Sequence, residues 1–100
     1  MRVQTAETTL AATSVVAAAT DQISCDLAGE EVILDLKSGV YYGLDVVGAR
    51  IWRLVQQPRS LSDITDAVMS EFEVGYDECK ADLLEFLTTM IGHGLVEIRN

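Results

Sequence analysis

The chain has 100 residues, of which 49% are apolar, so it can form one domain around a single core. Seven basic and sixteen acidic residues give a formal charge of −9, which disfavours nucleic acids and anionic membranes as partners. No stretch approaches the roughly 18 apolar residues that a membrane span needs, and the Ala-rich stretch at residues 10–19 lacks the flanks of a secretion signal. We therefore expect a soluble, cytoplasmic protein.

The first segment of the chain is polar and has no period, and we predict that residues 1–13 form a flexible N-terminal arm. The remainder, residues 14–100, is predicted to be one domain. Its β-branched beginning at Ser14–Val16 favours a short edge strand. A half-buried strand follows, in which Ile23, Cys25 and Leu27 alternate with polar residues.

Two further runs of alternating residues predict a three-stranded antiparallel meander. Glycine at position 29 indicates a hairpin into the stretch 31–37, and a Ser38-Gly39 turn leads to the stretch 40–44. We expect an inner apolar face made by one set of alternating side chains: Val32, Leu34, Leu36, Val40, Tyr42 and Leu44. On this interpretation Ile33 is the one apolar residue on the polar face, together with Glu31, Asp35 and Lys37. A sheet with one apolar face needs a cover.

Helical periodicity begins immediately after the meander and provides that cover. Asp45 is a good N-cap for a first helix, which ends before Pro58. Ser60 to Asp63 has the spacing of a capping box for a second helix, and Asp77 is predicted to cap a third. The stretch LVEI after Gly94 is a last strand or wing. The predicted fold is α+β, a three-stranded antiparallel β-meander followed by a three-helix winged helix-turn-helix.

A winged helix suggests DNA binding, but the charge of the third helix argues against it. Four acidic residues accompany a single basic one there: Asp77, Glu78, Asp82 and Glu85 against Lys80. The helix also lacks the Arg, Asn and Gln side chains that contact base edges. A helix of this charge would be repelled by the phosphates on both sides of a groove. We therefore predict no nucleic-acid partner.

The sequence offers no catalytic site. The single histidine, His93, lies between two glycines and is predicted to follow the third helix as its C-cap. No carboxylate pair, nucleophile motif, phosphate loop or metal-ligand cluster accompanies it. Cys25 and Cys79 each lie in an apolar pattern, and we predict two buried free thiols. No catalytic, cofactor-binding or metal-binding residue is predicted, and the protein is not expected to be an enzyme.

Two surfaces remain as candidates for binding. If the stretch Val40 to Leu44 is the last strand of the meander, its outer edge can accept an extended peptide by strand addition. On a helical wheel the third helix also carries an apolar flank beside Lys80, formed by Leu84, Leu87 and Ile91. That flank either lines a groove between helix and strand or packs against the second helix or the N-terminal arm, and the pattern leaves both interpretations open.

Several segments of the sequence resemble those of a known protein family. The run ILDLKSGVYYGLDVVGARIW, residues 33–52, resembles the signature of the PqqD-like proteins, also called RiPP recognition elements. In that signature a strand, a Ser/Thr-Gly turn, a Tyr-rich strand and the sequence Gly-Ala-x-Ile-Trp follow in this order. The segments PRSL at 58–61 and GLVE at 94–97 also match, and the resemblance covers residues 22–98.

The resemblance implies a non-catalytic, cofactor-free module that binds the leader segment of a ribosomally made precursor peptide and presents it to modifying enzymes. The leader would add to the third strand and lie against the third helix. Carried over to this chain, the strand contacts are Val40, Tyr41, Tyr42, Gly43 and Leu44. The wheel supplies the helix contacts, Lys80, Leu84, Leu87 and Ile91.

The length and the lead-in strand resemble the lasso-peptide type, which partners a transglutaminase-like leader protease. The alternatives are a peptide chaperone of pyrroloquinoline quinone synthesis, which would partner a radical SAM enzyme, and an acidic winged-helix regulator or interaction module. The protein is expected to be a monomer or, because an exposed edge strand can pair with a second copy, a strand-paired or swapped dimer.

Overall fold

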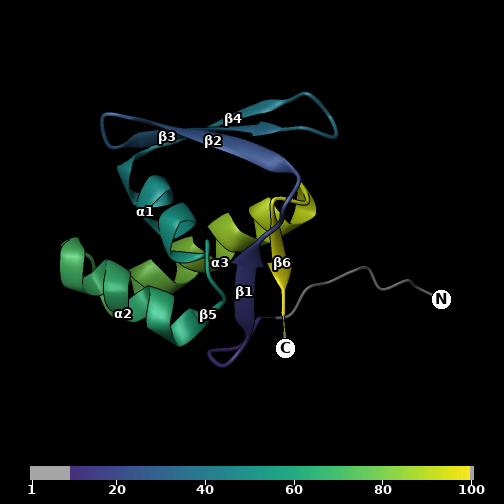
Figure 1. Ribbon diagram of the computed structural model, residues 1–100. Coiled ribbons are helices and arrows are strands. Elements are labelled where there is room, and N and C mark those ends of the chain that lie inside the picture. The colour runs from purple at the N-terminus through teal and green to yellow at the C-terminus, as the bar shows by residue number, and fades with distance from the viewer. Residues whose placement is uncertain (1–9, 100) are drawn as a thin grey trace.

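The predicted three-stranded meander is present in the computed structural model, which describes residues 10–99 of the chain (Figure 1). Its strands are β2 (Gln22–Leu27), β3 (Glu30–Asp35) and β4 (Tyr41–Leu44), in the order β2-β3-β4 and antiparallel. Ala28 and Gly29 both have positive φ (55° and 95°), the backbone that suits a two-residue hairpin between twisted strands. With the helices below the sheet, the predicted α+β class is confirmed.

Three helices lie beneath the meander in the described part of the chain: α1 (Val46–Leu54), α2 (Leu61–Glu71) and α3 (Tyr76–Gly92). The predicted caps of the first two are confirmed. The Asp45 carboxylate accepts from Gly48 N at 2.8 Å, and Ser60 Oγ accepts from Asp63 N at 3.1 Å. The predicted Asp77 cap of α3 is wrong, because the helix begins one residue earlier, at Tyr76, after an N-cap glycine without a side-chain bond.

A second sheet, which the sequence did not predict, joins the two ends of the described chain. Its order is β5-β1-β6, formed by β5 (Arg59–Ser60), β1 (Val15–Ala18) and β6 (Val96–Ile98). The predicted edge strand at the N-terminal side is therefore the central strand, paired antiparallel on both sides. Because β6 pairs with β1, the strand after α3 is not a separate hairpin. The winged helix-turn-helix description stays a prediction.

The inner face of the meander is the opposite of the predicted one in β3. Ile33 is fully buried (0% exposed), whereas Val32 and Leu34 are half-buried on the other face. The register places Ile33 beside Tyr42, so the two share the inner face, and Tyr42 and Leu44 pack on the core as predicted. The strand β2 follows the same inversion: its Ile23, Cys25 and Leu27 are exposed.

Two carboxylates on the buried face of β3 have partners that explain this orientation. Glu31 lies 3.3 Å from Arg53 Nη2 of α1, and the same guanidinium lies 3.2 Å from Asp26 of β2. Asp35 accepts from the Lys37 amide and the Ser38 hydroxyl, both at 3.0 Å. These bonds, the Lys37 amide first, hold the pKa of Asp35 below its usual range. They also end β3, which is why Leu36 lies in a turn and is exposed.

The core lies between the inner face of the meander, the three helices and the second sheet. The largest fully buried side chains come from all of these layers: Trp52, Ile33, Ile64, Leu87, Leu95, Val16 and Val55. Cys79 is buried as predicted, whereas the prediction of a buried Cys25 is wrong. Of the predicted arm, residues 1–9 lie outside the described residues. Leu10 packs against the core, and the Ala12 carbonyl accepts from Ser62 N at 3.1 Å.

Candidate functional site

The edge strand of the meander is β4, as predicted for the stretch 40–44. Within residues 10–99, β4 pairs with β3 along one side and with no strand along the other. The strand begins at Tyr41, one residue later than predicted, because Val40 belongs to the turn and its carbonyl accepts from Asp35 N at 3.0 Å. An edge of this kind offers backbone donors and acceptors to an extended segment.

Helix α3 lies beneath the meander (Figure 1), and the inner side of β4 faces the helices. The Tyr42 ring lies against the His93 ring, with centroids 4.9 Å apart. One step further along β4, a Cβ placed on Gly48 would lie 3.4 Å from Leu44 Cβ and 3.2 Å from Phe86 Cε1. Tyr42 therefore lies against the C-cap of α3, and Gly48 lies between Leu44 and Phe86, where the lack of a side chain allows α1 to approach closely.

A pocket of about 700 Å³ opens beside the end of β4, between the three helices. Most of its wall is apolar, and α3 provides one side of it. The lining residues include Val47, Ile51, Phe72, Leu83, Phe86 and Thr89. A pocket with an apolar wall beside a free strand edge can accept an apolar side chain from a segment that pairs with that edge.

Carboxylates surround this pocket. Asp45, Glu73, Asp82 and Glu85 line it, and neither a lysine nor an arginine does. Negative charge also affects the thiol of Cys79, which lies in the pocket wall. Burial, and secondarily the charges of Asp82 and Glu78, raise the pKa of that thiol. The thiol is therefore protonated at neutral pH, and it is not a nucleophile in this structure.

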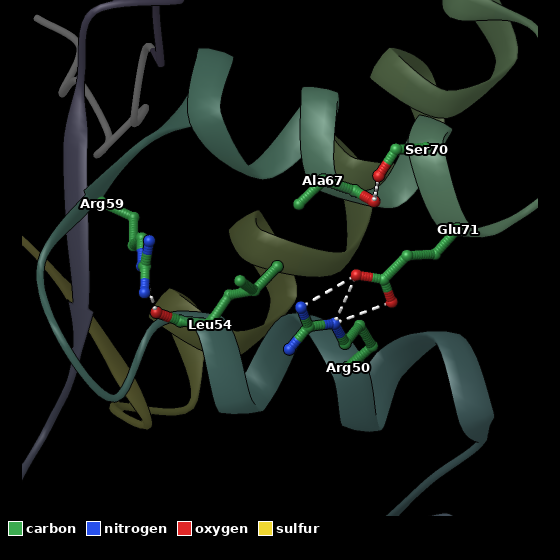
Figure 2. A network of polar contacts seen from close by, with 6 residues as sticks. All are labelled: Arg50, Leu54, Arg59, Ala67, Ser70 and Glu71. Carbon is green, nitrogen blue, oxygen red and sulfur yellow. Dashed lines mark hydrogen bonds and ion pairs between the residues drawn. The ribbon is translucent and has the colours of Figure 1, made fainter.

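An ion pair between Arg50 and Glu71 ties α1 to the end of α2 beside the pocket (Figure 2). The guanidinium donates from Nε to both carboxylate oxygens, at 2.8 and 3.0 Å, and from Nη2 at 2.8 Å. This bond lowers the pKa of Glu71. Figure 2 also shows Arg59 donating to the Leu54 carbonyl at 3.0 Å, which holds the connection that follows α1. Both contacts fix the helices that form the pocket wall.

The helix residues predicted from the wheel lie on the other flank of α3, away from this pocket. Lys80 and Leu84 line a smaller hollow of about 100 Å³, beside Leu10 to Ala12. Leu87 is fully buried, and Ile91 packs against the core. Of the two interpretations left open by the pattern, packing on the core and the N-terminal segment describes the placement of Leu84 and Ile91.

The pocket flank of α3, with Phe86 and Thr89, was missed by the sequence analysis. Neither residue was among the contacts predicted for the third helix. One signal was available: Gly48 lies inside a predicted helix, where glycine is unfavourable unless another element approaches closely.

No group of three or more His, Cys, Asp or Glu side chains among residues 10–99 could hold a metal ion. His93 follows α3 as its C-cap, as predicted. No helix in the same range is long and apolar enough to cross a membrane.

The outer face of the meander points away from the helices (Figure 1), and it is also apolar. Ile23, Leu27 and Tyr41 on this face are each more than half exposed. The register places Ile23 beside Leu34, and Leu34 beside Tyr41, so one apolar row crosses all three strands. This face is continuous with the free edge at Tyr41.

One protein family matches most of the chain. The family model described as coenzyme PQQ synthesis protein D (PqqD) matches residues 30–96. The solved structure of TbiB1 in complex with the TbiA(beta) leader peptide is similar over 81% of this chain and 94% of that chain, with 33% sequence identity and a TM-score of 0.76. The comparison with curated proteins finds no match.

A second solved structure, lasso peptide synthetase B1 complexed with the leader peptide, covers 82% of this chain and 96% of that chain. Its sequence identity is 22% and its TM-score 0.72, so the likeness shows the shared fold.

Proposed function

Because the chain belongs to the PqqD family, we propose that it binds the leader segment of a ribosomally synthesised precursor peptide and presents it to modifying enzymes. The observation that carries this proposal is the free edge of β4 beside the apolar pocket. The similar TbiB1 structure, which holds a leader peptide, supports it. The protein itself performs no chemistry in this proposal.

The leader adds as a strand to the free edge of β4, over Tyr41 to Leu44. Main-chain hydrogen bonds to this edge provide affinity, and alternate side chains of the added strand point inward toward the helices. An apolar side chain of the leader enters the pocket, where Phe86 and Thr89 form the α3 wall. The contacting flank of α3 is therefore the pocket flank, in place of the Lys80, Leu84, Leu87 and Ile91 flank inferred from the wheel.

Leader binding is tested by fluorescence polarisation with a fluorescein-labelled leader from the precursor encoded beside this protein. Saturable binding is expected, and its absence would favour an acidic winged-helix regulator or interaction module. Proline substitutions along the leader should weaken binding at alternate positions, roughly fivefold for each main-chain bond lost. Unchanged binding of every proline-substituted leader would exclude strand addition.

Substitutions at two adjacent threonines test which flank of α3 contacts the leader. Thr89 lines the pocket and Thr88 does not, and both are exposed on the same turn. Thr89→Tyr should weaken leader binding on the order of tenfold, because the larger side chain fills the pocket, whereas Thr88→Tyr should not change it. Lys80→Glu, on the other flank, should also leave binding unchanged. Loss of binding in Lys80→Glu alone would restore the flank inferred from the wheel.

The proposed partner enzyme is the transglutaminase-like leader protease of a lasso-peptide pathway. The fold shared with lasso peptide synthetase B1 favours this partner. The outer apolar face of the meander is the surface on which we place that enzyme, because it continues from the strand that holds the leader. Ile23→Glu, at the opposite strand β2, should weaken association with the purified protease in calorimetry while leader binding is unchanged. Loss of both would indicate unfolding or a different docking surface.

A second candidate is a peptide chaperone for pyrroloquinoline quinone synthesis, which the description of the matching family favours. In that case the partner is a radical SAM enzyme. Purified enzymes of both kinds, compared for association with the leader-bound protein, separate the two candidates. Sedimentation with and without leader tests the predicted monomer against a dimer paired through β4, which the leader should dissociate.

A further inference from the structure

We propose that the pocket beside β4 selects leader segments that carry a lysine or arginine within a few positions of the apolar residue that enters the pocket. The inference rests on the proposed function and specifies the chemical class of its ligand. It follows from the combination of an apolar wall and a rim on which every charged side chain is acidic.

The four carboxylates that line the pocket come from three separate segments of the chain. Asp82 and Glu85 are three residues apart on the pocket flank of α3, and Thr89 continues the same row. The other two are Asp45, before α1, and Glu73, after α2. A side chain that enters the pocket therefore lies near acidic groups from all of these segments.

Most of this negative charge is not neutralised by the chain itself. Asp45 is engaged by the Gly48 amide as an N-cap. For Glu73, Asp82 and Glu85, no ion pair or side-chain hydrogen bond is present within residues 10–99. All three are exposed, so a ligand can reach them.

None of the basic side chains among residues 10–99 lines the pocket. Arg50 pairs with Glu71, Arg53 with Glu31 and Asp26, Lys37 with Asp21, and Arg99 with Glu97. Arg59 donates to the Leu54 carbonyl, and Lys80 lines the small hollow on the other flank. The cation that would complement the rim must therefore come from the ligand. A metal ion does not fit this role, because no cluster with ligand geometry is found in the described residues.

Binding an apolar side chain makes the rim charges more important. A peptide that covers the pocket removes water from the nearby carboxylates, and this disfavours their charged form unless a cation replaces the water. Lysine and arginine are suited to this arrangement, since their aliphatic stems lie on apolar walls while their charged ends reach the rim. Screening limits the effect to within about 8 Å at physiological salt, so the basic residue must be close to the apolar one.

The test is a selection of random dodecapeptides displayed on phage against three forms of the full chain. The first is the wild type, and the second is the rim variant Glu73→Gln/Asp82→Asn/Glu85→Gln. The third is a control variant, Glu30→Gln/Asp66→Asn/Asp77→Asn, which neutralises three exposed carboxylates that do not line the pocket. Both variants change the formal charge from −9 to −6, so any difference between them is local.

Wild type and control are expected to enrich peptides in which a lysine or arginine accompanies an apolar residue, and the rim variant should lose the basic preference while keeping the apolar one. In fluorescence polarisation, replacing that basic residue by glutamine in the best peptide should weaken binding to wild type roughly three- to tenfold and leave binding to the rim variant unchanged. The wild-type difference should shrink between 50 and 500 mM NaCl.

The outcomes separate this inference from the function on which it rests. If the peptides selected by wild type bind but contain no excess of lysine or arginine, the charge preference is refuted and peptide binding stands. If the control variant loses the preference as fully as the rim variant, net charge explains it and the rim assignment is refuted. If wild type binds neither selected peptides nor the leader from the neighbouring precursor gene, the proposed function fails as well.

Discussion

The orientation of β3 predicts that two adjacent residues contribute very differently to the free energy of unfolding. Ile33 is fully buried beneath the meander, whereas Leu34 is half-buried on the outer face. Ile33→Ala removes three carbon atoms from the core at about 0.8 kcal/mol for each buried methylene, and the cavity left behind adds to this loss. We expect a decrease of about 3 kcal/mol in the free energy of unfolding. Leu34→Ala should cost about 1 kcal/mol or less.

Urea unfolding followed by fluorescence provides the assay. Trp52 is the single tryptophan and is 2% exposed, so its emission reports loss of the core. With a slope of about 1.5 kcal/mol/M, Ile33→Ala should lower the midpoint by about 2 M, and in thermal unfolding the midpoint should fall by roughly 10–20 °C. A loss in Leu34→Ala as large as that in Ile33→Ala would refute the orientation described here and restore the one predicted from alternation.

Three further predictions concern turns, caps and acid. Gly94→Ala should cost about 1 kcal/mol of unfolding free energy in urea because its φ is +76°, whereas Gly92→Ala, inside α3 and facing open space, should be neutral or stabilising. Asp45→Ala should cost about 1 kcal/mol by thermal unfolding through loss of the α1 cap, and Asp45→Asn should retain most of the stability. The pKa values of Asp35 and Glu71 are lowered in the folded state, so their stabilisation is present above the ordinary carboxyl range and is lost as pH falls through the folded pKa. Between about pH 5 and about pH 3 the urea midpoint should therefore fall less steeply in Asp35→Asn/Glu71→Gln than in wild type, and equal slopes would contradict this assignment.

The sequence predicted the elements of the meander and the helices well because each is determined by neighbours in the chain. The Asp45 and Ser60 caps, for example, are read from side chains that bond amides three residues away. The inward face of β3 depends on contacts that are distant in sequence. Both faces of the sheet are apolar, so alternation alone does not choose between them. The choice is made by Glu31, whose burial requires Arg53 of α1.

The site was predicted in part, for a similar reason. The edge strand follows from the order of the strands, which the two short turns determine. The flank of α3 that borders the pocket does not, because apolar residues occupy more than one side of that helix and tertiary packing decides between them. Leu87 was named as a peptide contact and is fully buried, whereas Phe86, which was not among the predicted contacts, lines the pocket.

The central position of β1 has a consequence for how the protein is made. Val16 pairs with Arg59 on one side and with Ile98 on the other, so its two partners are synthesised long after it. A nascent chain that has reached the end of α2 can form the meander and its first contacts with α1, but it leaves one side of β1 open. Such an edge is prone to pairing with other chains during synthesis. Pairing of β6 with β1 therefore closes an edge that is open to other chains until the last strand has emerged.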